Sequence, residues 1–178
     1  MTTKLLQNTK KLIPFAKGHA NGNDFIFIFS KNINNSENID KIVQTMCSRH
    51  TGVGADGLFI IDTSKKYDFI LDYYNSDGTW ETLCANGSRC AVKFMNECGF
   101  IKKSARFKAG DGEHVAKILP NGNVSMLMNT PRYESALIDV SGFRGYFINS
   151  GARHFVCEST NTAFTKVDAQ NNSAISWK

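Results

Sequence analysis

The stretch from Asp68 to Cys98 constrains the fold of this chain more than any other, because it indicates a strand, a turn and a helix in direct succession. Residues 68–74 form a largely apolar run of strand length, and the Asn, Asp and Gly residues at 75–78 favour a sharp turn. Beyond Asn86, apolar residues recur at three- and four-residue steps, which predicts one buried helix face. These residues are Ala91, Val92, Phe94, Met95 and Cys98, and Gly99 is the expected helix stop.

Cys84 lies just before the start of the predicted helix. Unpaired backbone N–H groups and the positive end of the helix dipole favour an anion at that position. We therefore expect the thiol pKa to fall from about 8.5 toward neutrality, and a substrate carboxylate to bind beside the sulfur. A reactive thiol next to a carboxylate site indicates chemistry on an α-amino or α-hydroxy acid.

The same residues resemble the first active-site half of the diaminopimelate epimerase family. Asn75-Ser76-Asp77-Gly78 is followed by Cys84-Ala85-Asn86-Gly87-Ser88-Arg89-Cys90. In the family, an N-A-D-G turn precedes C-G-N-G-x-R-C at this spacing, and the resemblance extends from Phe15 to Val156. Ala85 replaces the first glycine of C-G-N-G. If the backbone there needs a positive φ, alanine adds roughly 1 kcal/mol of strain, and if φ is negative it adds none.

Two further segments resemble family motifs. Gly18 to Asp24 resembles H-G-x-G-N-D-F, and by that match Asn23 is a substrate ligand, although an asparagine bonding its own loop is the alternative. Ser150-Gly151-Ala152 and His154 resemble G-N-P-H, in which the histidine supports the site. Ala152 and Arg153 replace the Asn-Pro pair, so one expected amide ligand is missing, and an ordinary strand histidine is the alternative for His154.

Gly52, Gly54 and Gly57 form a formal G-x-G-x-x-G motif, but a dinucleotide-binding motif follows a strand and opens a helix. Here the glycines follow a predicted helix and enter a predicted strand, so we reject nucleotide binding. The segment resembles the R-H-x-G-I/V-G loop of the family. Some members place a substrate-contacting glutamine where this chain has Gly57.

The complete pattern predicts an α+β fold, with an antiparallel or mixed sheet wrapped around the central helix. By resemblance, this is one complete domain of a pseudo-symmetric two-domain architecture. We expect an N-terminal extension at 1–14, a first epimerase-like domain at 15–129 and a truncated beginning of the second domain at 130–178. The other predicted elements are a helix at 36–50 capped by Ser36 and strands at 25–29, 58–61, 105–109, 114–119, 123–128, 145–149 and 153–157.

Inverting an α-carbon without a cofactor requires two opposed acid–base groups and strong stabilisation of the carbanionic transition state. The resemblance implies two cysteines, one from each domain, and no cofactor; Cys84 matches the first. It also implies that Asn23 and Asn75 hold the polar ends of the substrate, while Ala85 and Asn86 offer backbone N–H groups to its α-carboxylate. The family's second cysteine segment, A-C-G-T/S-G, is absent from these residues. We expect the other four cysteines to be buried small hydrophobes: Cys47, Cys90, Cys98 and Cys157.

The resemblance therefore implies a diaminopimelate epimerase that interconverts LL- and meso-2,6-diaminopimelate in lysine and peptidoglycan biosynthesis. With one of two catalytic cysteines, we expect a truncated chain with little or no activity alone. A homodimer or a separately encoded second half is a possible partner. Two alternatives stay open: a related cofactor-free isomerase, such as a proline racemase or a phenazine-type isomerase, and a non-catalytic binding protein.

Composition excludes several other classes. The net charge of +5 is spread along the chain without an arginine stripe, which argues against nucleic acid. The longest apolar runs are strand-sized, no secretory signal is evident, and five cysteines without framework spacing indicate a cytoplasmic protein without membrane association. Four scattered histidines and no C-x-x-C argue against a metal site, and Ser88 lacks the G-x-S-x-G setting of a serine hydrolase.

Overall fold

The computed structural model describes residues 12–34, 38–140 and 142–157. The chain divides into two compact units, Met1–Leu127 and Met128–Lys178, which are described separately. Most of the predicted N-terminal extension and the tail from Thr160 onward lie outside the described residues.

The first unit is built on one mixed eight-stranded sheet. Its strand order is β1-β2-β3-β4-β6-β7-β8, with β5 paired to β4. The β2–β3 and β4–β6 pairs are parallel and the other pairs are antiparallel. The strands are β1 (Ala16–Ala20), β2 (Asn23–Phe29), β3 (Gly57–Asp62), β4 (Phe69–Asn75), β5 (Trp80–Glu81), β6 (Ser104–Ala109), β7 (Gly112–Ile118) and β8 (Val124–Met126).

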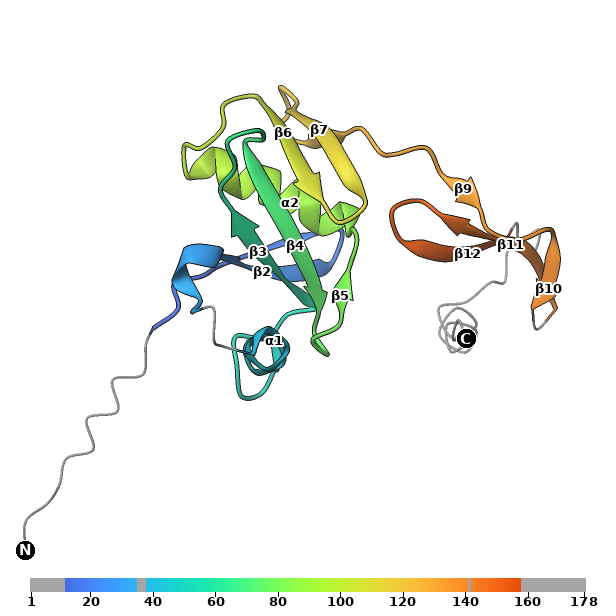
Figure 1. Ribbon diagram of the computed structural model, residues 1–178, viewed down its shortest axis with the longest axis horizontal. Helices are drawn as coiled ribbons and strands as arrows, with labels where there is room; N and C mark the ends of the chain where they lie inside the picture. Colours follow the sequence, from blue (N-terminus) through green and yellow to red (C-terminus); the bar gives the residue numbers. More distant parts are fainter. Residues whose placement is uncertain (1–11, 35–37, 141, 158–178) are drawn as a thin grey trace, which may run out of the picture. The chain divides into compact units, whose positions relative to one another are not determined.

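The sheet curves around the helix α2 (Ala85–Glu97), as Figure 1 shows. The α2 residues that were predicted to be apolar and inward, Ala91, Val92 and Met95, are buried. They pack on the phenylalanines of the inner sheet face, and Gly99 adopts a φ of 79° just beyond the helix. The predicted α+β fold with a sheet around a central helix is thus confirmed.

Gly87 allows the first turn of α2 to approach the sheet closely. A Cβ at this position would lie 2.1 Å from Cε2 and 2.3 Å from Cζ of Phe59, with Phe25 Cε1 at 3.3 Å. Any side chain there would therefore push the helix away from its aromatic support. The beginning of α2, where Cys84 lies, is fixed by this contact.

The opposite face of the sheet is covered by α1 (Ile39–Cys47). Val43 and Cys47 are buried against the outward-facing side chains of β2 and β3, namely Ile26, Ile28, Leu58 and Ile60. The helix begins later than predicted, because the Asn38 side chain accepts a hydrogen bond from the Lys41 backbone N–H at 3.1 Å. Ser36, the predicted cap, lies outside the described residues. A short 3₁₀ turn, η1 (Ser30–Asn32), follows β2.

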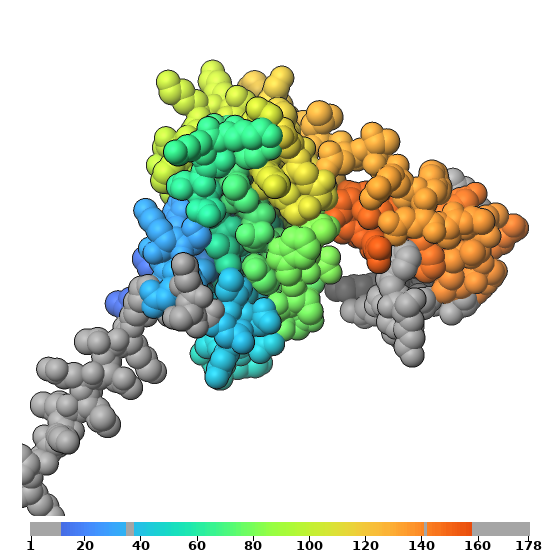
Figure 2. Space-filling view, in the orientation of Figure 1, coloured from blue at the N-terminus to red at the C-terminus, as the bar shows by residue number. Residues whose placement is uncertain are grey.

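Two strands of the first unit, β1 and β5, were not predicted from the sequence. The segment expected to be a loop at Gly18 to Asp24 is a hairpin, in which β1 and β2 are joined by Asn21 and Gly22 at φ values of 53° and 88°. The asparagines and glycines that predicted a loop therefore form only the turn between the two strands. β5 is the other missed strand; its residues are exposed, and it forms part of the light-green surface in Figure 2.

The second unit contains a four-stranded antiparallel sheet in the order β10-β11-β12, with β9 paired to β11. Its strands are β9 (Arg132–Tyr133), β10 (Ile138–Val140), β11 (Phe143–Asn149) and β12 (Arg153–Cys157). The two strands predicted at 145–149 and 153–157 are confirmed.

The close contact at Gly87 gives a first expected outcome. Gly87→Ala should lower the free energy of unfolding by about 1–3 kcal/mol, because the new methyl group overlaps the Phe59 ring. Urea denaturation followed by circular dichroism measures the change. Lys93→Ala, at an exposed position of the same helix, is the control and should change stability little. Equal stability of Gly87→Ala and the wild type would contradict the packing described here.

Candidate active site

Cys84 is the N-cap residue of α2, with extended backbone angles of φ −127° and ψ 106°. The Ser88 N–H donates to the Cys84 carbonyl at 2.8 Å and forms the first backbone hydrogen bond of the helix. The N–H groups of Ala85, Asn86 and Gly87 therefore have no carbonyl partner within the helix, and those of Asn86 and Gly87 face the Cys84 sulfur. The Cys84 sulfur and these backbone N–H groups thus lie together at the N-terminal end of α2.

The pKa of the Cys84 thiol is raised, so the expectation of a lowered pKa is wrong for the free chain. Burial is the largest cause, because the sulfur packs against the aromatic core and a thiolate there would lose its hydration. The backbone N–H groups of Gly87 and Asn86, the Arg89 guanidinium and the Tyr73 hydroxyl act in the opposite direction. At neutral pH, Cys84 thus carries its proton.

Ala85 causes no backbone strain. Among the described residues, Asn21 is the only non-glycine with a positive φ. Ala85 is the first residue of α2 and has ordinary helical geometry, so the glycine found in the family is not needed here for conformational reasons.

Asn23 and Asn86 belong to one chain of side-chain hydrogen bonds. Asn23 Nδ2 donates to Asp56 Oδ2 at 3.2 Å, and Asn86 Nδ2 donates to Asn23 Oδ1 at 3.0 Å. Asn86 Oδ1 in turn accepts from Asn21 Nδ2 at 3.2 Å and from the Arg89 guanidinium. An ionised carboxylate only accepts and a guanidinium only donates, so the two ends of the chain fix the orientation of both amides.

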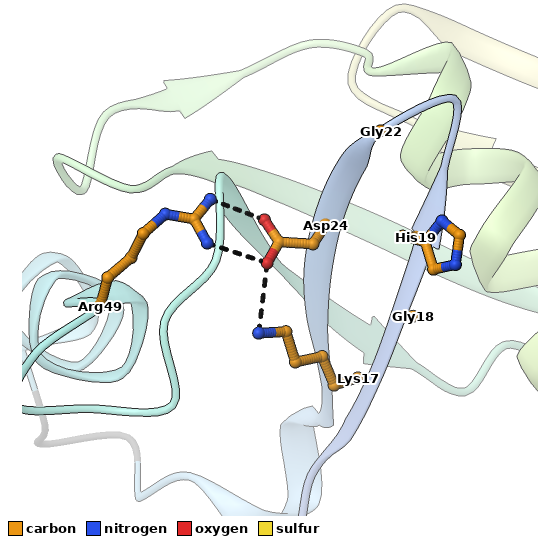
Figure 3. A pocket seen from close by; sticks show the side chains of 6 residues that line it. All are labelled: Lys17, Gly18, His19, Gly22, Asp24 and Arg49. Carbon is orange, nitrogen blue, oxygen red and sulfur yellow. Dashed lines mark hydrogen bonds and ion pairs between the residues drawn. The ribbon is translucent and has the colours of Figure 1, made fainter.

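An ion-pair cluster on the other side of β2 supports this chain (Figure 3). Arg49 donates to both Asp24 carboxylate oxygens, at 2.8 and 3.1 Å, and to Asp56 Oδ1 at 2.6 Å. Lys17 Nζ lies 3.2 Å from Asp24 Oδ2. The Arg49 hydrogen bonds hold the pKa of Asp24 well below its usual range, so the carboxylate stays ionised. Lys17, Asp24 and Arg49 line, with His19, a surface hollow beside the β1–β2 hairpin.

Asn75 lies at the end of β4, where the predicted turn begins, and Gly78 in that turn has a φ of 90°. The Asn75 amide is held on both sides. Its Oδ1 accepts from the Tyr73 hydroxyl at 3.0 Å, and its Nδ2 donates to Thr79 Oγ1 at 3.1 Å. The side chain is therefore oriented before any ligand binds.

The remaining residues singled out in the sequence are placed as follows. His154 is exposed on β12 of the second unit, opposite Ile148. Gly57 opens β3 after the glycine loop, so the order of helix, loop and strand that argues against nucleotide binding is confirmed. Cys47 is buried as predicted, and Cys90 and Cys157 are half-buried. Cys98 is exposed, because it caps the C-terminal end of α2 instead of continuing its inner face.

Sequence reasoning missed several residues that orient the site: Asn21, Arg49, Asp56, Tyr73 and Arg89. Two of them had a local signal, since Arg89 belongs to the thiol motif and Asp56 to the glycine loop. Asn21 and Arg49 also lie in segments that resemble family motifs, at Gly18 to Asp24 and in the R-H-x-G loop, but their partners Asn86 and Asp24 are distant in the sequence.

Within the described ranges, no three His, Cys, Asp or Glu side chains lie close enough to hold a metal ion. In the same part of the chain, no helix is long and apolar enough to cross a membrane.

Residues 15–134 match the sequence family described as diaminopimelate epimerase. The chain belongs to this family. Diaminopimelate epimerase from Flavobacterium psychrophilum is 35% identical over 159 residues, covering 89% of this chain and 59% of that protein. The enzyme from Aquifex aeolicus is 37% identical over 157 residues, covering 80% of this chain and 56% of that protein. The chain thus spans somewhat more than half the length of these curated relatives.

Two solved structures share the fold at low sequence identity. The hydroxyproline epimerase from Agrobacterium vitis has a TM-score of 0.66 at 11% identity, with 84% of this chain and 52% of that chain covered. A phenazine biosynthesis protein of the PhzF family from Bacillus anthracis has a TM-score of 0.58 at 16% identity, with 90% and 57% covered. The epimerase family therefore shares this architecture with proline- and phenazine-related proteins.

The Asp24–Arg49 pair predicts how stability depends on pH. Because the pKa of Asp24 is lowered in the folded chain, its stabilisation is present above the ordinary value of 3.8 and is lost as the pH falls below it. Asp24→Asn should lower the free energy of unfolding at neutral pH by about 1–2 kcal/mol. The difference from the wild type should shrink in acid. Urea denaturation at about pH 7 and about pH 3 measures both values.

Glu97→Gln, which replaces an exposed carboxylate of α2, is the control and should leave the pH dependence unchanged. A constant difference between wild type and Asp24→Asn over this pH range would show that Asp24 ionisation does not stabilise the fold.

Proposed function

We propose that this chain contributes one half of the active site of a diaminopimelate epimerase, which interconverts LL- and meso-2,6-diaminopimelate by proton transfer at an α-carbon. The observation that carries the proposal is the position of Cys84 at the start of α2, beside the oriented amides of Asn23 and Asn86. This arrangement lies within the residues that match the family.

The helix end supplies the site for the α-carboxylate. The N–H groups of Ala85 and Asn86 lack helical partners, and the helix dipole favours negative charge there. A carboxylate bound to these amides places the attached α-carbon next to the Cys84 sulfur. It also brings donors close to the charge that develops on the carboxylate as the α-proton leaves.

The asparagines supply the site for an amino group. Asn23 and Asn75 each accept one hydrogen bond on Oδ1, from Asn86 and Tyr73 respectively. A carbonyl oxygen has a second lone pair, so both oxygens can still accept from an ammonium group. One N–H of each amide is used on Asp56 or Thr79, and this fixes the direction in which each carbonyl oxygen points. This polarity fits the ammonium groups of diaminopimelate.

Cys84 acts as one of two acid–base groups in this proposal. In the free chain its pKa is raised by burial, so it holds a proton that it can deliver to a carbanionic α-carbon. In the reverse direction the resulting thiolate removes that proton. A second group on the opposite face of the substrate is required for inversion. His154 is proposed to have a supporting role, on the basis of its resemblance to the family's histidine.

The cellular setting is also part of the proposal. The enzyme would act in the cytoplasm in lysine and peptidoglycan biosynthesis, with no cofactor. A homodimer or a separately encoded second half is its proposed partner, and the second acid–base group would come from such a second half. The sequence relatives favour diaminopimelate over proline or a phenazine precursor, since the latter classes resemble this chain in fold alone.

The purified 178-residue polypeptide should bind LL-diaminopimelate and produce little or no meso isomer, because a single thiol cannot serve both faces of the α-carbon. Isothermal titration calorimetry measures binding, and proton NMR in D₂O measures α-deuterium incorporation. Proline and hydroxyproline serve as comparison ligands. Neither should bind saturably or exchange its α-hydrogen for deuterium. Tight binding of proline without binding of diaminopimelate would contradict the proposed substrate.

Co-expression of the 178-residue polypeptide with the C-terminal part of a related epimerase should give isomerisation. Restored turnover should be abolished by Cys84→Ala and kept by Cys98→Ala, which alters an exposed thiol of the same helix. Turnover by the 178-residue chain alone that Cys84→Ala abolishes would overturn the expectation that a second half is required.

A further inference from the structure

Asp56 connects the ion-pair cluster of Arg49 and Asp24 to Asn23, a proposed substrate ligand. The residue directly precedes β3, and the two oxygens of its carboxylate have different partners. Oδ1 accepts from the Arg49 guanidinium at 2.6 Å, and Oδ2 accepts from Asn23 Nδ2 at 3.2 Å. The Asp24 backbone N–H also donates to Oδ2, at 3.2 Å. The same carboxylate thus contacts a guanidinium on one side and the amide of Asn23 on the other.

The backbone of Asp56 is held on both sides as well. Its N–H donates to the backbone carbonyl of Asp24 and to Asp24 Oδ1, both at 3.0 Å. Its carbonyl oxygen accepts from the Ser76 N–H at 3.1 Å, in the turn that begins at Asn75. The position of Asp56 is therefore fixed by β2 and by the turn after β4, the two elements that carry the asparagines of the proposed site.

From Asn23, the chain of hydrogen bonds continues to a second guanidinium. Asn86 Nδ2 donates to Asn23 Oδ1 at 3.0 Å, and Asn86 Oδ1 accepts from Arg89. The complete chain therefore has an arginine at each end, and its members in order are Arg49, Asp56, Asn23, Asn86 and Arg89. A guanidinium only donates, whereas an amide donates through its nitrogen and accepts through its oxygen.

A chain with a donor at each end needs one member that only accepts. An amide that accepts from its neighbour on one side presents its NH₂ group on the other side. A chain made of amides alone between two guanidiniums would therefore leave two donors facing each other at one step. The Asp56 carboxylate prevents this conflict, because it accepts from Arg49 on one oxygen and from Asn23 on the other.

We propose that Asp56 is a positioning residue that determines specificity through Asn23. As the acceptor-only member between two arginines, it draws the NH₂ group of Asn23 to itself and leaves the Asn23 oxygen on the side where an ammonium group binds. This inference deepens the proposed function and rests on it for the identity of the ligand. It adds the reason why the site prefers an amino acid to a dicarboxylate of the same length that lacks amino groups.

The test compares the binding of LL-diaminopimelate with that of pimelate, which has the same two carboxylates and no amino group, by isothermal titration calorimetry. Asp56→Asn keeps the shape of the side chain but replaces one carboxylate oxygen with NH₂. Because Arg49 forms the shorter of the two hydrogen bonds, the remaining oxygen should stay with Arg49 and the Asn23 amide should reverse. The preference for diaminopimelate over pimelate should then fall about tenfold.

Asp24→Asn is the control for charge, because it removes one negative charge from the same cluster and leaves Asp56 as the acceptor. It should keep the preference for diaminopimelate, as should Arg49→Gln. The double variant Arg49→Gln/Asp56→Asn should regain the preference, since a glutamine side chain can accept from the new NH₂ group. An unchanged preference in Asp56→Asn, or an equal fall in Asp24→Asn, would overturn the proposal.

A measurement without ligand separates this inference from the proposed function. In nitrogen–proton NMR spectra of the free chain, the side-chain amides of Asn23 and Asn86 should each give one sharp set of signals in the wild type. Asp56→Asn should broaden or split these signals, and the double variant with Arg49→Gln should restore one set. Unchanged signals in Asp56→Asn would overturn the inference whether or not diaminopimelate binds, whereas failure of the wild type to bind diaminopimelate would contradict only the proposed function.

Discussion

The contact between Gly87 and the ring of Phe59 is the constraint on which the site depends. The first turn of a helix offers free N–H groups wherever it lies, but here they must meet the amides on β2 and the end of β4. Only a residue without a Cβ lets the helix come close enough to the inner sheet face. The hydrophobic core and the candidate active site are therefore one assembly, and the same phenylalanines that stabilise the unit also hold Cys84 in place.

Hydrogen bonds of fixed direction orient the polar side chains of the site, in addition to the packing of α2 on the sheet. One chain runs from the Asp56 carboxylate through Asn23 and Asn86 to the Arg89 guanidinium. A second runs from Tyr73 through Asn75 and Thr79 to Asp77. Each chain has a donor group at one end, Arg89 or Tyr73, and a carboxylate that accepts at the other, Asp56 or Asp77. These hydrogen bonds fix the orientation of the asparagine side chains, so that their oxygen atoms can accept from a cation. The backbone N–H groups at the start of α2 lie beside them and can bind an anion.

The sequence predicted the parts of this site that are local. The helix after Cys84, the turn at 75–78 and the strands 25–29 and 58–61 follow from periodicity and turn chemistry, because these are short-range effects. The pKa of Cys84 was predicted in the wrong direction, since burial by side chains from distant strands outweighs the local helix end. Likewise, the hydrogen bond between Asn23 and Asp56 depends on the pairing of β2 with β3, which no local pattern specifies. Cys98 was also predicted to be buried, but it is exposed at the C-terminal end of α2.

The central claim is that Cys84 lies beside the bound carboxylate of an amino acid. Protection of individual cysteines from alkylation, measured by mass spectrometry with and without diaminopimelate, tests it most directly. The account predicts slower modification of Cys84 in the presence of the ligand, with no change at Cys98 on the same helix. Saturable binding of diaminopimelate that leaves the alkylation rate of Cys84 unchanged would contradict it.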